Sequence, residues 1–230
     1  MPRRDVKRKR PSSQQPHLLE GYLRHRFAWL FLSLLLTLGA APVLRALVPN
    51  FPLDLLLAVT LITAIASTAH ERWIQLLLLL GFAFLVTRGI QVLTGAQALL
   101  SLSQVLWVLA ALLATATAVR HAMRAGPVNA ERIFAALDVY LLAGLIFGVC
   151  YWLLDQTWPA SFGPATESPL ELPQAIYFSF VTIATLGYGD IVPVSDLARG
   201  IAILEAVSGQ LYLVVLVARL VSLYARQAED

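Results

Sequence analysis

Six apolar stretches dominate the sequence, each close to the ~20 residues that an α-helix needs to cross the hydrocarbon core of a membrane. They cover residues 27–48, 52–69, 72–93, 98–119, 133–154 and 198–224. Turn-forming and charged residues separate them, as in "VPNFP", "AHER" and "RHAMRAGPVNAER", so each stretch predicts a separate helix. Because 58% of the residues are hydrophobic and only 13% are charged, we expect an all-α membrane protein with six transmembrane helices.

The basic residues favour one orientation across the membrane, since cytoplasmic loops carry an excess of lysine and arginine. Eight of the 17 basic residues precede Phe27, and Arg72, Arg120 and Arg226 fall on the same predicted side. We therefore expect a multi-pass protein of the cell membrane with both termini in the cytoplasm. The opposite side carries acidic residues before the last stretch, which would concentrate cations there: Asp155, Glu167, Glu171, Asp190 and Asp196.

Residues 1–26 form a polar, basic segment with proline and serine, which predicts a disordered cytoplasmic tail. Its charge is expected to act as a topology signal, and membrane lipid, anionic lipid in particular, is a candidate partner, whereas nucleic acid is not expected. The single cysteine, Cys150, excludes a disulfide within one chain. The sequence has no metal-ligand spacing of Cys and His and no nucleophile–base set, so we expect neither an enzyme nor a cofactor.

A different pattern lies between the fifth and sixth stretches. After the polar stretch "DQTWPASFGPATESPLE" comes an apolar run from Pro173 to Thr185 that is too short to cross a membrane. Proline suits the first turn of a helix, so we predict a re-entrant helix whose C-terminal carbonyl groups favour a cation near the membrane centre. The alternate glycines Gly187 and Gly189 permit backbone angles that can turn successive carbonyl oxygens toward one axis. Irregular backbone at membrane depth is tolerated only inside protein or along a water-filled path, so this segment should line such a path.

The segment "TLGYGD" closely resembles the selectivity filter of the tetrameric potassium channels, and "YFSFVTIAT" is similar to the pore helix of that family. Gly209 follows Gly189 by 20 residues, which matches the family's usual distance from the filter to the hinge of the inner helix. Residues 133–225 thus resemble a pore domain with an outer helix (133–154), a pore helix (173–184), a filter (185–190) and an inner helix (198–224). Residues 120–132 and 226–230 would then be a cytoplasmic linker and a short cytoplasmic tail.

The resemblance implies a homotetramer in which each chain supplies one quarter of the pore. Backbone carbonyl oxygens would bind K+ as the permeant ion, with the Thr185 hydroxyl at the inner end and Gly189 shaping the mouth. The resemblance also implies that Tyr177 and Phe178 brace the filter and that Asp190 anchors its outer end. The implied carbonyl ligands are those of Thr185, Leu186, Gly187 and Tyr188.

The inner helix carries two further candidate site residues and one candidate pore-lining stripe. Gly209 is expected to serve either as a hinge or as a close-packing site. Glu205 is an ionisable residue deep in this helix, about 140° around it from Gln210, so it should face the pore helix or a neighbouring subunit. Both structural hydrogen bonding and a role in gating or protonation stay open for Glu205. Helical spacing also predicts a stripe that lines the cavity and the inner gate: Gln210, Leu213, Val217 and Val221.

Residues 27–119 resemble the sensor domain of the channel superfamily in the number and order of their helices. The fourth stretch carries no basic residue before Arg120, and Arg88 lies on the third, whereas voltage sensors need repeated arginines. We therefore expect a sensor-like domain without gating charges in a potassium-selective ion channel that conducts passively and is not classically voltage-gated. One alternative is a poorly selective cation channel, because Leu186 replaces the commoner valine of the filter. A transporter or an accessory membrane subunit is another, although no inverted repeat is visible.

Overall fold

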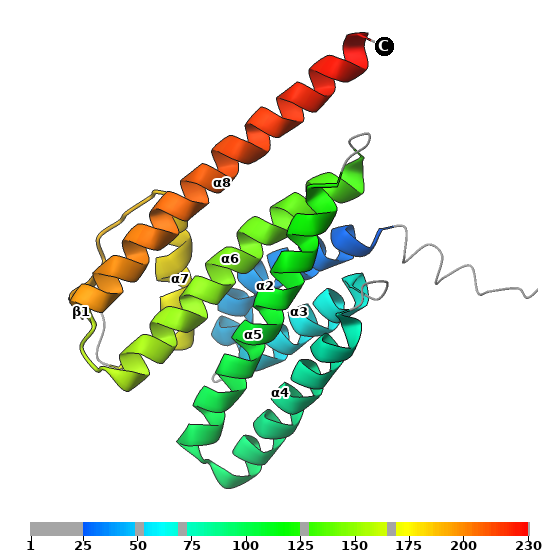
Figure 1. Cartoon of the computed structure of the whole chain (residues 1–230). Helices are drawn as coiled ribbons and strands as arrows, with labels where there is room; N and C mark the ends of the chain where they lie inside the picture. The colour runs from blue at the N-terminus through cyan, green and yellow to red at the C-terminus, as the bar shows by residue number, and fades with distance from the viewer. Residues whose placement is uncertain (1–24, 49–52, 69–72, 125–128, 165–168, 230) are drawn as a thin grey trace, which may run out of the picture.

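The computed structural model describes residues 25–48, 53–68, 73–124, 129–164 and 169–229, and these form a largely helical protein (Figure 1). The tail predicted for residues 1–26 lies outside the described residues as far as residue 24. The elements in chain order are α2 (Arg26–Leu47), α3 (Leu53–Ser67), α4 (Ile74–Thr94), α5 (Gln97–Ala122), α6 (Ala130–Thr157), β1 (Phe162–Pro164), α7 (Leu172–Ile183), β2 (Ile191–Pro193) and α8 (Asp196–Glu229).

Within the described chain, four helices are long and apolar enough to cross a membrane, and they belong to α4, α5, α6 and α8. The apolar segments of α2 and α3 are shorter, Arg26–Ala40 and Leu55–Ser67. In α2 the apolar segment ends just before Pro42 and Arg45. The 15 residues of α3 span only about 22 Å at roughly 1.5 Å per residue. Four helices therefore support the prediction of a membrane protein, while the full set of six spans stays a prediction.

Two helices extend beyond their predicted boundaries. The predicted fifth helix starts at 133, but α6 starts at Ala130, because the side chain of Asn129 accepts a hydrogen bond from the Arg132 amide at 3.0 Å and caps the helix. At the other end of the chain, α8 continues to Glu229. The tail predicted for residues 226–230 is thus helical over its described part, since arginine, glutamine, alanine and glutamate are all good helix formers.

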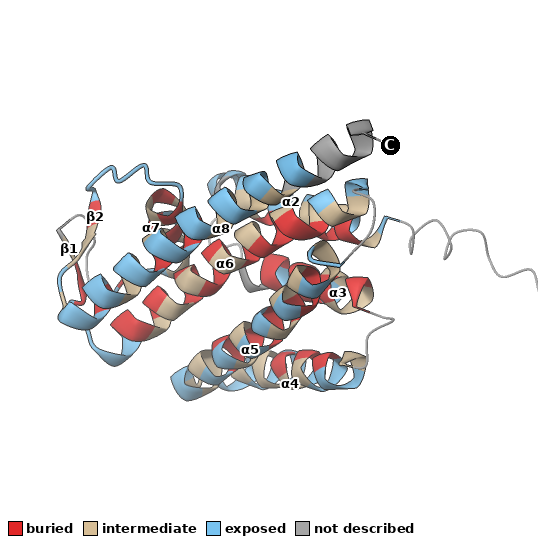
Figure 2. Cartoon of the chain, turned by 45° about the horizontal axis from the view of Figure 1, so that its top comes forward, coloured by how far each residue is buried: buried red, intermediate tan, exposed pale blue. Residues whose placement is uncertain are grey.

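α6 is the central helix and contacts helices on both sides of it (Figure 1). It packs against α2 and α5 on one side and against α7 and α8 on the other. One apolar cluster runs from α2 to α7 and includes Leu34, Leu57, Phe84, Trp107 and Leu145. Figure 2 shows buried residues along α6, whereas α8 is mostly exposed. A single chain therefore leaves a wide apolar surface on α8, as expected for a helix that faces lipid or other subunits.

The helices α2–α5 fall within residues 27–119, apart from their outermost residues. Several polar groups inside this bundle are hydrogen-bonded, which offsets the cost of burying them. The Trp107 indole donates to the Leu57 carbonyl at 3.0 Å, which joins α5 to α3. The hydroxyls of Ser33 and Thr63 lie 2.8 Å apart and join α2 to α3. These hydrogen bonds connect three of the four helices, and the predicted sensor-like character of the bundle stays a prediction.

Candidate functional site

α7 is a short helix that contacts α6 and α8. A capping box starts it, in which the Gln174 side chain accepts a hydrogen bond from the Glu171 amide at 2.9 Å. Pro173 lies in the first turn, where its missing amide hydrogen costs nothing. With 12 residues, α7 begins one residue before the predicted helix 173–184 and is too short to cross a membrane.

Two glycines of α6 allow α7 to approach closely. A Cβ atom added to Gly144 would lie 2.6 Å from a ring carbon of Phe180. A Cβ atom added to Gly148 would lie 2.7 Å from the backbone Cα of Ile176. Because the two glycines are four residues apart, they lie on the same face of α6, in the small-residue pattern that is typical of tightly packed membrane helices. The position of α7 therefore depends on the absence of side chains at these two places.

The chain leaves α7 through a turn whose critical residue is a threonine. The Leu186 amide donates to the Val181 carbonyl at 2.9 Å. The Thr185 amide donates to the Thr182 carbonyl at 3.0 Å. Together these bonds form a Schellman motif, in which the left-handed residue is usually glycine. Thr185 occupies that position with a φ of 59°, a strained conformation for a β-branched residue and one that is concentrated at functional sites.

Residues 185–190 continue from this turn without helix or strand. Positive φ recurs at alternate residues, with 58° at Gly187 and 78° at Gly189 after the 59° of Thr185. A Cβ atom added to either glycine would meet nothing within 4 Å, so the backbone conformation, and not crowding within the chain, requires glycine there. The side chains of Leu186 and Tyr188 are 56% and 66% exposed in the single chain.

A two-stranded clamp holds the chain beyond this segment. β1 pairs with β2 in antiparallel register, with Phe162 opposite Pro193, and the Val194 amide donates to the Ser161 carbonyl at 2.8 Å. Strands of three residues leave no periodic signal, so the sequence did not indicate them. The clamp connects the chain that follows α6 directly to the chain that follows residues 185–190.

Asp155 supports the same loop, and its position corrects the prediction that it belongs to an outer acidic surface. Its carboxylate accepts hydrogen bonds from the backbone amides of Ser161 at 3.0 Å and Leu170 at 2.7 Å, and its side chain is buried. Asp155 therefore organises the loop and does not belong to an outward-facing acidic surface. By contrast, Glu171, Asp190 and Asp196 are exposed.

The predicted aromatic supports make different contacts. Phe178 is buried and forms edge-to-face ring contacts with Tyr151 and Phe162, at centroid distances of 5.0 and 5.3 Å. Tyr177 is 40% exposed, and its side chain lies close enough to the side chain of Asp190 to interact with it. Phe178 thus anchors α7 in the interior, while Tyr177 links α7 to the far end of residues 185–190.

Residues 136–226 match the model of a protein family described as an ion channel. Protein LctB of Bacillus caldotenax is 31% identical over 96 residues, which cover 40% of this chain and 71% of LctB. The chain belongs to this ion channel family. The matched residues, which we call the ion-channel domain, begin in α6 and end in α8. They therefore include α7, residues 185–190 and both strands of the clamp.

Two further relatives match shorter regions. The calcium-gated potassium channel TvoK of Thermoplasma volcanium is 57% identical over 35 residues, which are 15% of this chain. The voltage-gated potassium channel Kch of Escherichia coli is 52% identical over 48 residues, which are 21% of this chain. The chain spans only 10% and 11% of the lengths of these two relatives. No solved structure matches the chain.

Glu205 is fully buried inside the ion-channel domain. Its carboxyl group accepts a hydrogen bond from the Tyr151 hydroxyl at 2.6 Å and is also hydrogen-bonded to the Ser179 hydroxyl. The side chain thus points toward α7, one of the two directions that its helical spacing from Gln210 left open. Sequence reasoning missed both partners, because Tyr151 and Ser179 lie on other helices and no spacing connects them to Glu205.

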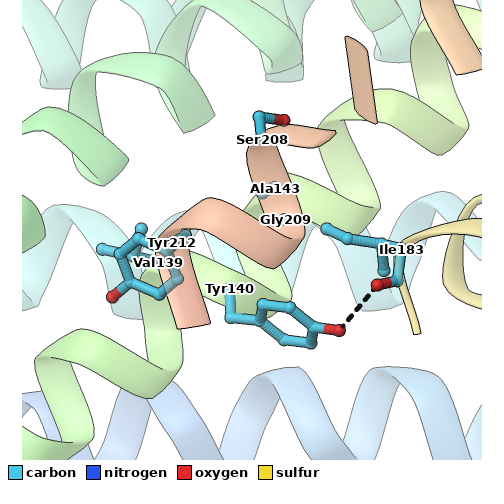
Figure 3. A pocket seen from close by; sticks show the side chains of 7 residues that line it. All are labelled: Val139, Tyr140, Ala143, Ile183, Ser208, Gly209 and Tyr212. Carbon is cyan, nitrogen blue, oxygen red and sulfur yellow. Dashed lines mark hydrogen bonds between the residues drawn. The ribbon is translucent and has the colours of Figure 1, made fainter. Parts of the chain in front are cut away.

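Gly209 lies where α8 meets the end of α7. A Cβ atom added to it would lie 2.5 Å from the side chain of Ile183, so a larger residue here would displace that side chain. Gly209 also lines a hollow of about 190 Å³ between α6 and α8, together with Tyr140, Ile183 and Tyr212 (Figure 3). The Tyr140 hydroxyl donates to the Ile183 carbonyl at 3.2 Å, as Figure 3 shows. Of the two predicted roles of Gly209, the contact with Ile183 supports close packing, and a hinge stays a prediction.

The predicted pore-lining stripe runs down α8 from this point. The Gln210 amide donates to the same Ile183 carbonyl at 3.5 Å. Leu213 is half-buried, and Val217 and Val221 are 57% and 63% exposed. Gln210 is thus connected to α7, and the lining role of the four residues stays a prediction.

Proposed function

We propose that the protein is a potassium-selective ion channel and that residues 185–190 form its selectivity filter, with α7 as the pore helix. The observation that carries the proposal is the positive φ at alternate residues from Thr185 to Gly189, directly after a short helix. Alternation of this kind lets successive carbonyl oxygens face one axis, where they replace the water shell of K+. TvoK and Kch, to which parts of the chain are similar, are both potassium channels, and this similarity supports the same choice of ion.

The proposed channel is a homotetramer in the cell membrane, with both termini in the cytoplasm. One chain supplies only one set of carbonyl oxygens, so a closed ring needs several copies around the axis. α8 also exposes apolar side chains on more than one face, including Ile203 at 64%, Leu204 at 66% and Val214 at 64%. Contacts with neighbouring subunits and lipid would cover these faces.

Planar-bilayer recording of the purified protein under a potassium/sodium gradient tests the proposed selectivity. We expect unitary currents that reverse near the equilibrium potential of potassium, because the filter carbonyls are matched to dehydrated K+. Unitary currents that reverse near zero would instead support a poorly selective cation channel, the alternative that Leu186 raises. Slow, saturable flux without unitary steps would contradict a channel and favour a transporter.

We further predict that opening depends only weakly on voltage. Each charge that moves through the field contributes about 2.3 kcal/mol per 100 mV, so a steep response needs several moving charges. α5, the fourth helix of the bundle, has no basic residue before Arg120 near its end, and α4 carries Arg88 alone. Open probability measured between roughly −100 and +100 mV in symmetric potassium should change little. A steep sigmoidal curve equivalent to several charges would show that the bundle does contain a voltage sensor.

A further inference from the structure

A chain of four oxygen-containing groups connects α6, α7 and α8 behind the proposed filter. On α8, Glu205 Oε2 lies 2.6 Å from the Tyr151 hydroxyl of α6. Glu205 Oε1 is hydrogen-bonded to the Ser179 hydroxyl of α7. The same Ser179 hydroxyl lies 2.7 Å from the Gly144 carbonyl oxygen of α6. Ser179 and Glu205 are both fully buried, so these contacts lie away from bulk solvent.

The number of hydrogen atoms decides the protonation state of this chain of oxygens. Three oxygen–oxygen contacts at hydrogen-bond distance need three hydrogens. The Gly144 carbonyl has none, and the hydroxyls of Tyr151 and Ser179 have one each. If Glu205 were an ionised carboxylate, one contact would bring two oxygen lone pairs together without a hydrogen. A neutral carboxylic acid at Glu205 supplies the third hydrogen, so that Glu205 donates to Ser179 and Ser179 donates to Gly144.

The surroundings of Glu205 also disfavour a negative charge. No described Lys, Arg or His forms an ion pair with it. Among the described residues, the titratable groups that interact with its charge include Tyr140, Cys150 and Tyr151, all on α6, and none of these three is a cation. A buried carboxylate without a counter-charge is costly, most of all inside a membrane. A neutral acid avoids this cost and satisfies all three contacts.

We propose that Glu205 is a protonated carboxylic acid that donates its hydrogen to Ser179, and that it acts as a positioning residue for α7. Through this hydrogen, α8 and α6 hold the helix from which residues 185–190 begin. The effect on ion conduction rests on the proposed channel function, whereas the protonation state can be measured without any conduction.

Infrared difference spectroscopy of the reconstituted protein at neutral pH tests the protonation state. The carbonyl stretch of a carboxylic acid is separate from carboxylate bands and shifts on exchange into heavy water. We expect the wild type to show such a band that is absent from Glu205→Gln. Asp138→Asn is the matched control, because Asp138 is another fully buried carboxyl group of the ion-channel domain. The Glu205 band should persist in this control. A wild-type minus Glu205→Gln spectrum with only carboxylate bands would overturn the proposal.

Conduction tests the positioning role. Glu205→Gln can donate to Ser179 and accept from Tyr151, so we expect it to keep the wild-type current within about two-fold. Glu205→Leu leaves both hydroxyls without their partner, and we expect a current at least roughly ten-fold lower. Alkaline pH should decrease the wild-type and Asp138→Asn currents but not that of Glu205→Gln, since ionisation removes the third hydrogen. A pH profile shared by the wild type and Glu205→Gln would contradict the role. If the wild type itself carried no current, the proposed channel function would fail while the infrared result still decided the protonation of Glu205.

Discussion

Replacing Gly187 or Gly189 with alanine is expected to abolish potassium-selective current while the protein still inserts into the membrane. Both residues have positive φ, and an L-residue in this left-handed region costs about 1–2 kcal/mol. An added methyl group would meet nothing within 4 Å in the single chain, so the expected damage comes from the backbone. A shift of the backbone toward negative φ would rotate the neighbouring carbonyl groups out of the proposed ion path. Bilayer recording with reversal potentials measures this loss.

The matched control for these variants is Gly95→Ala. Gly95 also has positive φ, 69°, and nothing lies within 4 Å of an added Cβ atom, but it ends α4 far from residues 185–190 along the chain. We expect this control to lose stability by a similar amount and to keep the wild-type reversal potential. Normal current and ion preference in both Gly187→Ala and Gly189→Ala would show that residues 185–190 are not the filter.

Gly148→Ala is expected to have the largest effect on stability. The added methyl group would lie 2.7 Å from the Cα and 3.2 Å from the amide nitrogen of Ile176. Backbone atoms cannot rotate away as a side chain can, so α6 and α7 must separate. Overpacking of this kind costs about 1–3 kcal/mol, and we expect the upper end of that range. Thermal unfolding in detergent measures the loss of stability, and bilayer recording measures the accompanying loss of current as α7 moves.

Gly89→Ala provides the comparison for this variant. Gly89 lies within α4, and nothing occupies the 4 Å around an added Cβ atom. Since alanine has a higher helix propensity than glycine, we expect unchanged or slightly increased stability. Equal thermal stability of Gly148→Ala and Gly89→Ala would contradict the close contact between α6 and α7.

Local patterns in the sequence were sufficient to predict most of the helices and the unusual backbone at the candidate site. The length of an apolar run and the position of a proline are properties of neighbouring residues, and so the short helix α7 was predicted within one residue of its bounds. The alternate glycines Gly187 and Gly189 likewise indicated unusual backbone, because only glycine adopts positive φ freely. The structure extended that pattern to Thr185, where the Schellman motif imposes a conformation that threonine itself disfavours.

The contacts that hold this site together depend on the tertiary structure, because they join residues that are far apart in the chain. Glu205 could be recognised from sequence as a buried ionisable residue, but its hydrogen bonds to Tyr151 and Ser179 exist only because three helices meet there. Asp155 looked like a surface acid and is instead buried, since two backbone amides of a folded loop need an acceptor. The sequence alone thus determined which segments are helical and where the backbone is unusual. The packing of α6 against α7 and α8 decided which polar groups meet, because a buried hydrogen bond forms only where folding brings a donor and an acceptor within reach of each other.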